Sequence, residues 1–258
     1  MMRPTAWWRL AIIGVVAGFF SGLFGVGGGV LIVPLLIMLA HFDQRRASGT
    51  SLTAILPTAI AGAAGYAVRG EIDLIAAICV AGGAVGGSFV GAWLLHRIPQ
   101  RVLRWIFVAF LVLMAARMAL SVPDRGAEIE LGIASVLALA GLGLLTGVLS
   151  GLLGVGGGVI VVPVLIVLFG MGDLVAKGTS LLMMIPISVT GTVANVRRGN
   201  SDVRAAVILG LLAVPASLAG VAVATTVPPQ LGAILFAVLL LFTAVQLGAR
   251  ALRTRGCL

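Results

Sequence analysis

Apolar residues dominate the chain in long runs that short polar connections separate. The runs cover Leu10–Ala40, Ala47–Val68, Leu74–Leu95, Val102–Val122, Leu131–Phe169, Gly178–Val196, Val203–Thr226 and Leu231–Ala249. A helix that crosses the ~30 Å hydrocarbon core of a membrane needs about 20 apolar residues, because each residue rises ~1.5 Å. Most runs suit one crossing, and the first and fifth are too long for one. The pattern predicts an all-α, polytopic membrane protein.

Composition and charge agree with this class. Hydrophobic residues make up 60% of the chain and charged residues 10%, whereas soluble domains carry roughly 25% charged residues. The net charge of +9 comes mainly from Arg in short connections. These residues orient the chain in the bilayer, and no exposed basic domain is available to bind nucleic acid. Cys79 and Cys257 form no metal or disulfide framework, and we expect no cofactor or metal.

An internal repeat divides the chain into two halves. The ten residues from Ser21 to Val30 recur from Ser150 to Val159, with Leu153 in place of Phe24. The same shift aligns further matches, which are Val33-Pro34 with Val162-Pro163, Gly49-Thr50-Ser51-Leu52 with Gly178-Thr179-Ser180-Leu181, Arg69-Gly70 with Arg198-Gly199, and Asp73 with Asp202. Such self-similarity indicates a duplicated unit. We expect one half at residues 1–121, a connecting loop at 122–130 and the second half at 131–258.

Charge indicates how each half crosses the membrane. Four of the five positions from Gly25 to Gly29 are Gly, each costing about 1 kcal/mol in a helix relative to Ala, so a broken or re-entrant helix is expected there. If the two pieces form a hairpin, Arg69, Arg117, Arg125 and Lys177 are the basic residues on one side, and all others lie on the opposite side. A single crossing divides the basic residues more evenly. The excess of positive charge in the cytoplasm therefore favours the hairpin.

The hairpin reading gives each half three membrane-spanning helices besides its broken helix. An odd number of crossings inverts the second half and leaves both termini in the cytoplasm. Inverted repeats with interrupted helices are typical of secondary transporters, which bind substrate near the midplane at the breaks. Parallel repeats remain the alternative.

The two Gly runs are the first candidate substrate site. They comprise Gly25, Gly27, Gly28 and Gly29 in one half, and Gly154, Gly156, Gly157 and Gly158 in the other. A helix that restarts after such a run directs free N–H groups and the positive end of its dipole toward an anion. Close helix packing through small residues is the alternative.

Polar residues near the runs are further candidates for binding substrate. They are Ser21, Ser150, Thr50, Ser51, Thr179, Ser180 and Asn195. Their hydroxyl and amide groups could bind an oxyanion, or they could cap helices or bond their own backbone. Arg69 and Arg198 stand at the ends of apolar runs and are candidate gating residues, with snorkelling to the interface as the alternative. No acidic residue lies deep in a run, so no carboxylate proton relay is visible.

At these residues the sequence resembles the sulfite exporter TauE/SafE family of bacterial membrane proteins. The carrying features are Gly22–Pro34 and its copy Gly151–Pro163, the Gly-Thr-Ser segments and the Arg-Gly pairs. The resemblance covers nearly the whole chain. It implies about eight membrane segments in the cytoplasmic membrane, and a permease for sulfite, sulfonates or related organosulfur anions.

Together these observations predict a secondary transporter of small anions, with a proton or Na⁺ as a conceivable coupling ion. An anion channel and a non-transport membrane subunit remain alternatives. An enzyme is not expected, because no nucleophile–base pair or ligand cluster is apparent. One chain holds both half-sites, so a monomer would suffice, and an oligomer is possible.

Overall fold

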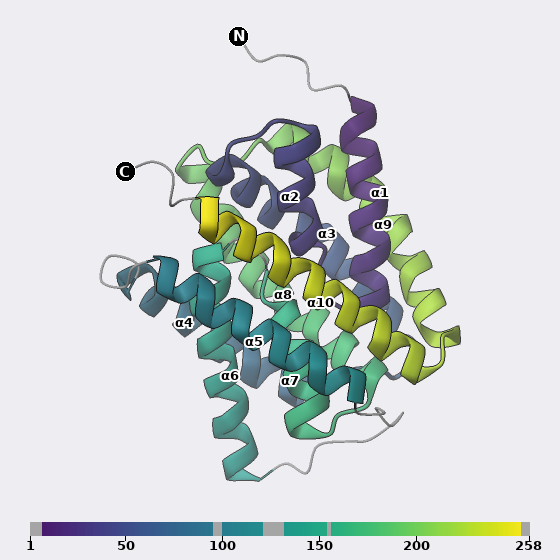
Figure 1. Cartoon of the computed structure of the whole chain (residues 1–258). Helices are drawn as coiled ribbons and strands as arrows, with labels where there is room; N and C mark the ends of the chain where they lie inside the picture. Colours follow the sequence, from purple (N-terminus) through teal and green to yellow (C-terminus); the bar gives the residue numbers. More distant parts are fainter. Residues whose placement is uncertain (1–6, 95–99, 121–131, 154–155, 254–258) are drawn as a thin grey trace.

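The computed structural model describes residues 7–94, 100–120, 132–153 and 156–253. Within these ranges the chain folds into helices alone (Figure 1). The first half contributes α1 (Trp7–Phe24), α2 (Gly29–Leu39), α3 (Gln44–Ala67), α4 (Leu74–Leu94) and α5 (Gln100–Leu120). The second contributes α6 (Ile133–Leu153), α7 (Gly158–Phe169), α8 (Asp173–Arg197), α9 (Val203–Thr226) and α10 (Pro229–Arg253). The predicted connecting loop at 122–130 lies outside the described residues.

The helices confirm a multi-pass membrane protein. Among the described residues, five segments are long and apolar enough to cross a membrane, namely Trp7–Phe24, Ile133–Ser150, Asp173–Arg197, Val203–Thr226 and Pro229–Ala249. By contrast, α2 and α7 have 11 and 12 residues, fewer than the roughly 17 that a crossing requires. Large apolar side chains such as Leu211 and Val245 are exposed on the outer surface, as a lipid-facing surface allows.

The repeat found in the sequence reappears in the helices. Adding 129 to the first residue of α2, α3 and α4 gives the first residue of α7, α8 and α9. The start of α1 lies beside the end of α2, because Arg9 Nη1 donates to the Leu39 carbonyl at 2.9 Å. These two helices form a hairpin at the upper end of Figure 1, whereas α6 and α7 occupy the lower end.

Each half packs its first helix against the fourth helix of the other half. A Cβ added to Gly18 of α1 would lie 2.6 Å from Ala213 Cα of α9. In the equivalent pair, a Cβ on Gly147 of α6 would lie 2.9 Å from Ala84 Cα of α4. Small residues at such contacts let helices approach closely in membranes, where no hydrophobic driving force brings helices together. The two halves are therefore interlocked.

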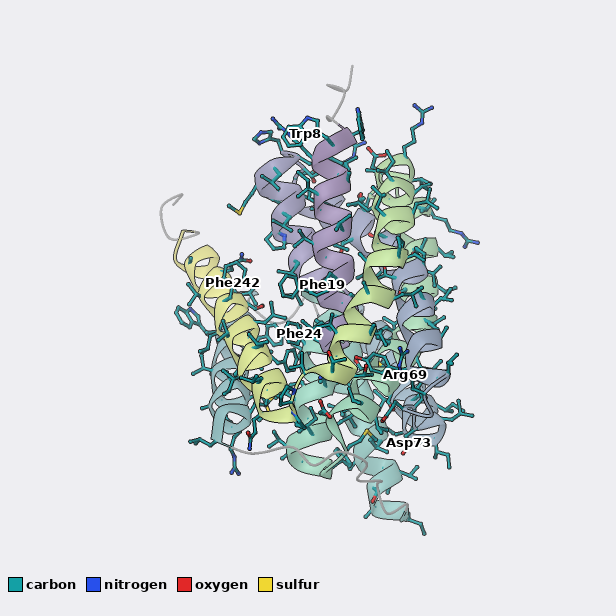
Figure 2. All side chains as sticks on the ribbon, turned by 90° about the vertical axis from the view of Figure 1, so that its right-hand side faces the viewer. Trp8, Phe19, Phe24, Arg69, Asp73 and Phe242 are labelled. Carbon is teal, nitrogen blue, oxygen red and sulfur yellow. The ribbon has the colours of Figure 1, made fainter. Side chains whose placement is uncertain are left out.

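The centre of the molecule is the antiparallel pair α3 and α8. Gly49 near the start of α3 contacts Asn200 just beyond the end of α8, and Gly178 near the start of α8 contacts Glu71 just beyond the end of α3. Helices α5 and α10 pack on each other and cross the front of the view in Figure 1. Figure 2 shows Trp8 at the upper end of the molecule and Arg69 and Asp73 in its lower part.

Candidate functional site

Both Gly runs lie where a helix stops and a short helix starts. Between α1 and α2, Gly25, Gly27 and Gly28 adopt φ values of 69°, 72° and 74°. Between α6 and α7, Gly156 and Gly157 adopt φ values of 83° and 80°. Side chains other than hydrogen rarely tolerate this left-handed region. Gly154 lies outside the described residues.

The short helices start on these glycines. Gly28 is the N-cap of α2 and Gly157 the N-cap of α7, and neither supplies a side-chain cap. Gly29 and Gly158 are the first helical residues. The first N–H groups of a helix have no partner within that helix, so each short helix presents donors at its start.

The two runs touch each other. A Cβ added to Gly158 would lie 2.8 Å from Val26 Cα and 2.9 Å from the Gly25 carbonyl oxygen. Gly25 in turn lies against the backbone and Cβ of Lys177 on α8. Segments 129 residues apart in sequence therefore meet at one place, beside the central helix α8.

Buried hydroxyl groups surround this contact. Ser21, Ser51 and Ser180 are fully buried, and no hydrogen-bond partner for their Oγ atoms is found among the described residues. Ser180 lies on α8 between Lys177, which contacts Gly25, and Met184, which contacts Gly27 and Gly156. Ser150, in the last turn of α6, is also buried. Unpaired buried hydroxyls are costly, which makes these groups candidates to bind a ligand.

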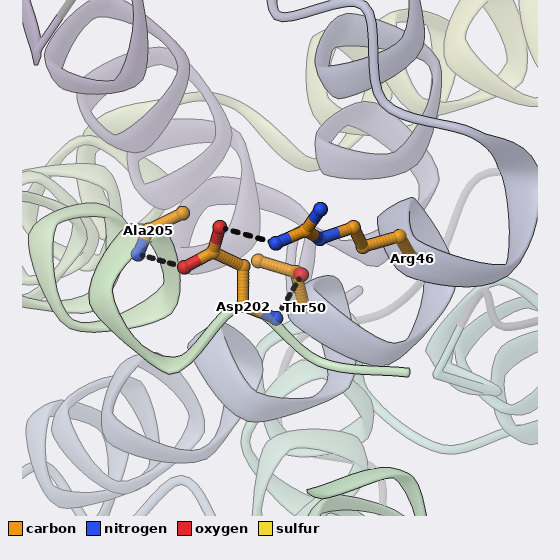
Figure 3. A network of polar contacts seen from close by, with 4 residues as sticks. All are labelled: Arg46, Thr50, Asp202 and Ala205. Atoms are coloured by element: carbon orange, nitrogen blue, oxygen red, sulfur yellow. Dashed lines mark hydrogen bonds and ion pairs between the residues drawn. The ribbon is translucent and has the colours of Figure 1, made fainter. Parts of the chain in front are cut away.

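The threonines of the Gly-Thr-Ser segments have partners in the opposite half. Thr50 Oγ1 accepts the Asp202 N–H at 3.0 Å (Figure 3), and Thr179 Oγ1 accepts the Asp73 N–H at 2.9 Å. Each Asp also caps the next helix, because its Oδ1 accepts an N–H three residues later. The Thr hydroxyls therefore connect the two halves. Binding of substrate by Thr50 and Thr179 stays a prediction.

The Arg-Gly pairs end the central helices. Gly70 and Gly199 have φ values of 72° and 67°, and the N–H of the residue after each Gly bonds a carbonyl five residues earlier, as in a Schellman motif. The adjacent Arg69 and Arg198 are exposed, at opposite ends of the antiparallel pair. Arg69 Nη1 donates to the Gly65 carbonyl at 2.6 Å. A gating role for both arginines stays a prediction.

Tyr66 and Asn195 occupy equivalent positions but have different surroundings. The buried Tyr66 hydroxyl donates to the Gly22 carbonyl at 2.8 Å, in the last turn of α1 before the first Gly run. Asn195 is partly exposed, and its Nδ2 donates to Gly191 in its own helix at 2.8 Å. The two half-sites therefore differ, and substrate binding by Asn195 stays a prediction.

Sequence reasoning missed a buried ion pair beside the first Gly run. Lys177 Nζ lies 3.1 Å from Asp173 Oδ2, and both side chains are 5% exposed. Asp173 is the first residue of α8, at the end of an apolar run, so its burial was not apparent from the sequence. The four-residue spacing of Asp and Lys on one helix face was the available signal. Among the described residues, no three His, Cys, Asp or Glu side chains gather as a metal site would require.

The comparisons with known proteins agree with this architecture. The family model described as Sulfite exporter TauE/SafE matches residues 1–118 and 139–256. "Probable membrane transporter protein YdhB" of Bacillus subtilis is 30% identical over 196 residues, which cover 75% of this chain and 80% of the relative. "Probable membrane transporter protein YunE" of the same organism is 26% identical over 215 residues, covering 74% and 78%.

A third relative comes from an archaeon. A "Probable membrane transporter protein" of Methanocaldococcus jannaschii is 31% identical over 167 residues, covering 60% of each chain. The family match extends over both halves of the repeat and includes both Gly runs. This chain is a multi-pass membrane protein that belongs to the Sulfite exporter TauE/SafE family of membrane transporters.

Proposed function

We propose that the protein is a secondary transporter that moves small anions, sulfite or organosulfur compounds such as sulfonates, across the bacterial cytoplasmic membrane. The observation that carries the proposal is the contact between the two Gly runs, where two short helices start beside buried hydroxyl groups that have no hydrogen-bond partner among the described residues. Substrate binds near the midplane at this contact, and one chain holds the complete site.

Several features support an anion as the substrate. The starts of α2 and α7 supply N–H donors and the positive ends of two helix dipoles. Ser21, Ser51 and Ser180 can donate hydrogen bonds to oxyanion oxygens. The buried Lys177, whose backbone and Cβ contact Gly25, carries a cation that pairs with Asp173. Charged groups at membrane depth are costly, and they usually mark ion or substrate pathways.

The two halves, at residues 1–121 and 131–258, are related as inverted repeats in the proposed transporter. The α1–α2 and α6–α7 hairpins lie at opposite ends of the molecule (Figure 1), which supports re-entry of each Gly run from a different side of the membrane. The bond between Arg9 and Leu39 supports a return of α2 to the side where α1 starts. Each half then has three full crossings, and both termini are cytoplasmic.

The proposal is tested by reconstituting the protein in liposomes and measuring uptake of labelled sulfite, sulfate, taurine and sulfoacetate. Each anion is tested with and without an imposed pH gradient or Na⁺ gradient. We expect saturable, gradient-driven uptake of a sulfur anion. Uptake that rises linearly with concentration and cannot be driven uphill would indicate a channel. No uptake of any of these anions would contradict the proposed substrates.

A pair of variants tests the site. Gly28→Leu places a side chain at φ 74° at the start of α2, with its Cβ 3.0 Å from the Ala17 carbonyl oxygen. Gly70→Leu requires the same backbone strain at φ 72° in a turn where no atom lies within 4 Å of the added Cβ. We expect loss of uptake in the first variant and uptake in the second. Equal uptake by both variants would contradict a site at the Gly run.

A further inference from the structure

Two apolar side chains contact both Gly runs beside the place where the runs meet. Ile55 of α3 and Met184 of α8 are fully buried, and the 129-residue shift of the repeat relates them to each other. A Cβ added to Gly156 would lie 2.7 Å from Met184 Cε and 3.2 Å from Ile55 Cδ1. Gly27 is likewise in contact with Met184, and its added Cβ would lie 3.3 Å from Ile55 Cγ2. The same two side chains therefore contact a left-handed Gly of each run.

The buried serines lie on either side of these two residues. Ser51 precedes Ile55 by one helical turn, and Ser180 precedes Met184 by one turn, so each serine shares a helix face with the apolar residue that follows. Because α3 and α8 are antiparallel, the two serines lie on opposite sides of the level at which Ile55 and Met184 contact Gly27 and Gly156. An apolar layer thus separates two hydroxyl groups for which the described part of the chain offers no hydrogen-bond partner.

We propose that Ile55 and Met184 form the barrier that separates the two half-sites, and that Met184 is the part that moves when the anion passes. This inference rests on the proposed function. An apolar constriction blocks ions by excluding water, so an anion at one serine cannot reach the other while both side chains are in place.

The two side chains differ in mobility. Met is unbranched and has three rotatable side-chain bonds, so it adapts its shape at little cost. Ile is β-branched and is held close to one χ1 rotamer in a helix. Ile55 therefore provides a fixed wall, and rotation of the Met184 side chain opens the passage. The repeat thus has one stiff and one flexible residue at equivalent positions.

The barrier is tested by thiol accessibility, which needs no transported anion. Cys79 and Cys257, the two cysteines of the chain, are first replaced by Ser. Ser51→Cys and Ser180→Cys are then introduced separately. A membrane-impermeant thiosulfonate reagent is added from either side in vesicles of known orientation. We expect Ser51→Cys and Ser180→Cys to react from opposite sides, each at least tenfold faster from its own side.

Removing the Met184 side chain should abolish this difference in reaction rate between the two sides of the membrane. In the Met184→Ala background, we expect Ser180→Cys to react at similar rates from both sides, and Met184→Leu should preserve the difference. Leu182→Ala is the control, because Leu182 lies two positions earlier on α8, about 200° around the helix axis from Met184. Gel filtration checks that each variant is folded.

The outcomes separate this proposal from the proposed function. The barrier would be overturned if, in the Met184→Ala background, Ser180→Cys still reacted faster from one side or reacted from neither side. This holds even if the parent protein transports anions. Reaction of either cysteine from both sides in the parent background would also overturn it. If Met184→Ala abolishes the difference in reaction rate between the two sides, the barrier is supported whichever anion is transported. In uptake assays, Met184→Ala is expected to produce anion leak that does not saturate, and Met184→Leu is expected to retain saturable uptake.

Discussion

Replacing Lys177 by Met removes a buried cation of α8 whose backbone contacts the first Gly run, and it takes this ion-pair partner from the Asp173 carboxylate. The two groups lie 3.1 Å apart, with each side chain 5% exposed. Breaking a buried ion pair costs about 3–5 kcal/mol, because the remaining charge loses its counter-ion and stays out of water. In chains of this size 1 kcal/mol shifts Tm by roughly 2–4 °C, so we expect Lys177→Met to lower Tm by about 6–20 °C.

A second substitution separates the structural role of Lys177 from its role with substrate. Combining Lys177→Met with Asp173→Asn removes both charges, and replacing a buried pair by neutral groups is often close to neutral for stability. We therefore expect the double variant to regain most of the lost Tm. If the cation also attracts the anion, the KM for uptake stays raised by about tenfold or more, which corresponds to ~1.4 kcal/mol.

The assay combines thermal denaturation of the detergent-solubilised protein with uptake into liposomes. Arg46→Met is the matched control, because the Arg46–Asp202 pair has the same 3.1 Å separation but side chains that are 33% and 18% exposed. Exposed pairs contribute only about 0–1 kcal/mol, and this pair is less buried than Lys177–Asp173, so the Tm of Arg46→Met should fall less. If the double variant has the KM of the parent protein, the Lys177 cation does not attract the anion. Its role would then be only the structural one of pairing with Asp173.

Two further substitutions test the contacts between the halves. Gly83→Leu should prevent stable folding, because its Cβ would meet the backbone of α6, 3.0 Å from Leu144 N. Gly82→Leu should fold normally, because nothing lies within 4 Å of its Cβ. Fluorescence-detected gel filtration of both variants measures folding, and a monodisperse Gly83→Leu protein would contradict the packing argument. Thr179→Val should destabilise the protein by about 1 kcal/mol through loss of its bond to a loop N–H of the opposite half. Thr190→Val should have a smaller effect, because the Thr190 hydroxyl donates to the Pro186 and Ile187 carbonyls of its own helix. Equal Tm shifts would argue against the connection between halves.

The sequence by itself determined the class of the protein and its duplication. Transfer of apolar residues into lipid depends on local composition, so long apolar runs identify membrane helices without knowledge of the fold. The repeat of Ser21–Val30 at Ser150–Val159 is likewise a property of the chain alone. The cost of Gly within helices predicted a break at Gly25–Gly29, and in the structure α1 ends at Phe24 and α2 starts at Gly29.

Only the tertiary structure decided which groups meet. The Thr50 hydroxyl was a candidate ligand in the sequence, but it accepts the N–H of Asp202, 152 residues away. Nothing in the apolar pattern distinguished Ile55 and Met184 from other buried residues, although each contacts both Gly runs. Contacts of this kind depend on how the two halves interlock through α1 with α9 and α4 with α6. That packing is set by the close approach of small residues on different helices, and a single sequence does not record which small residues will face each other.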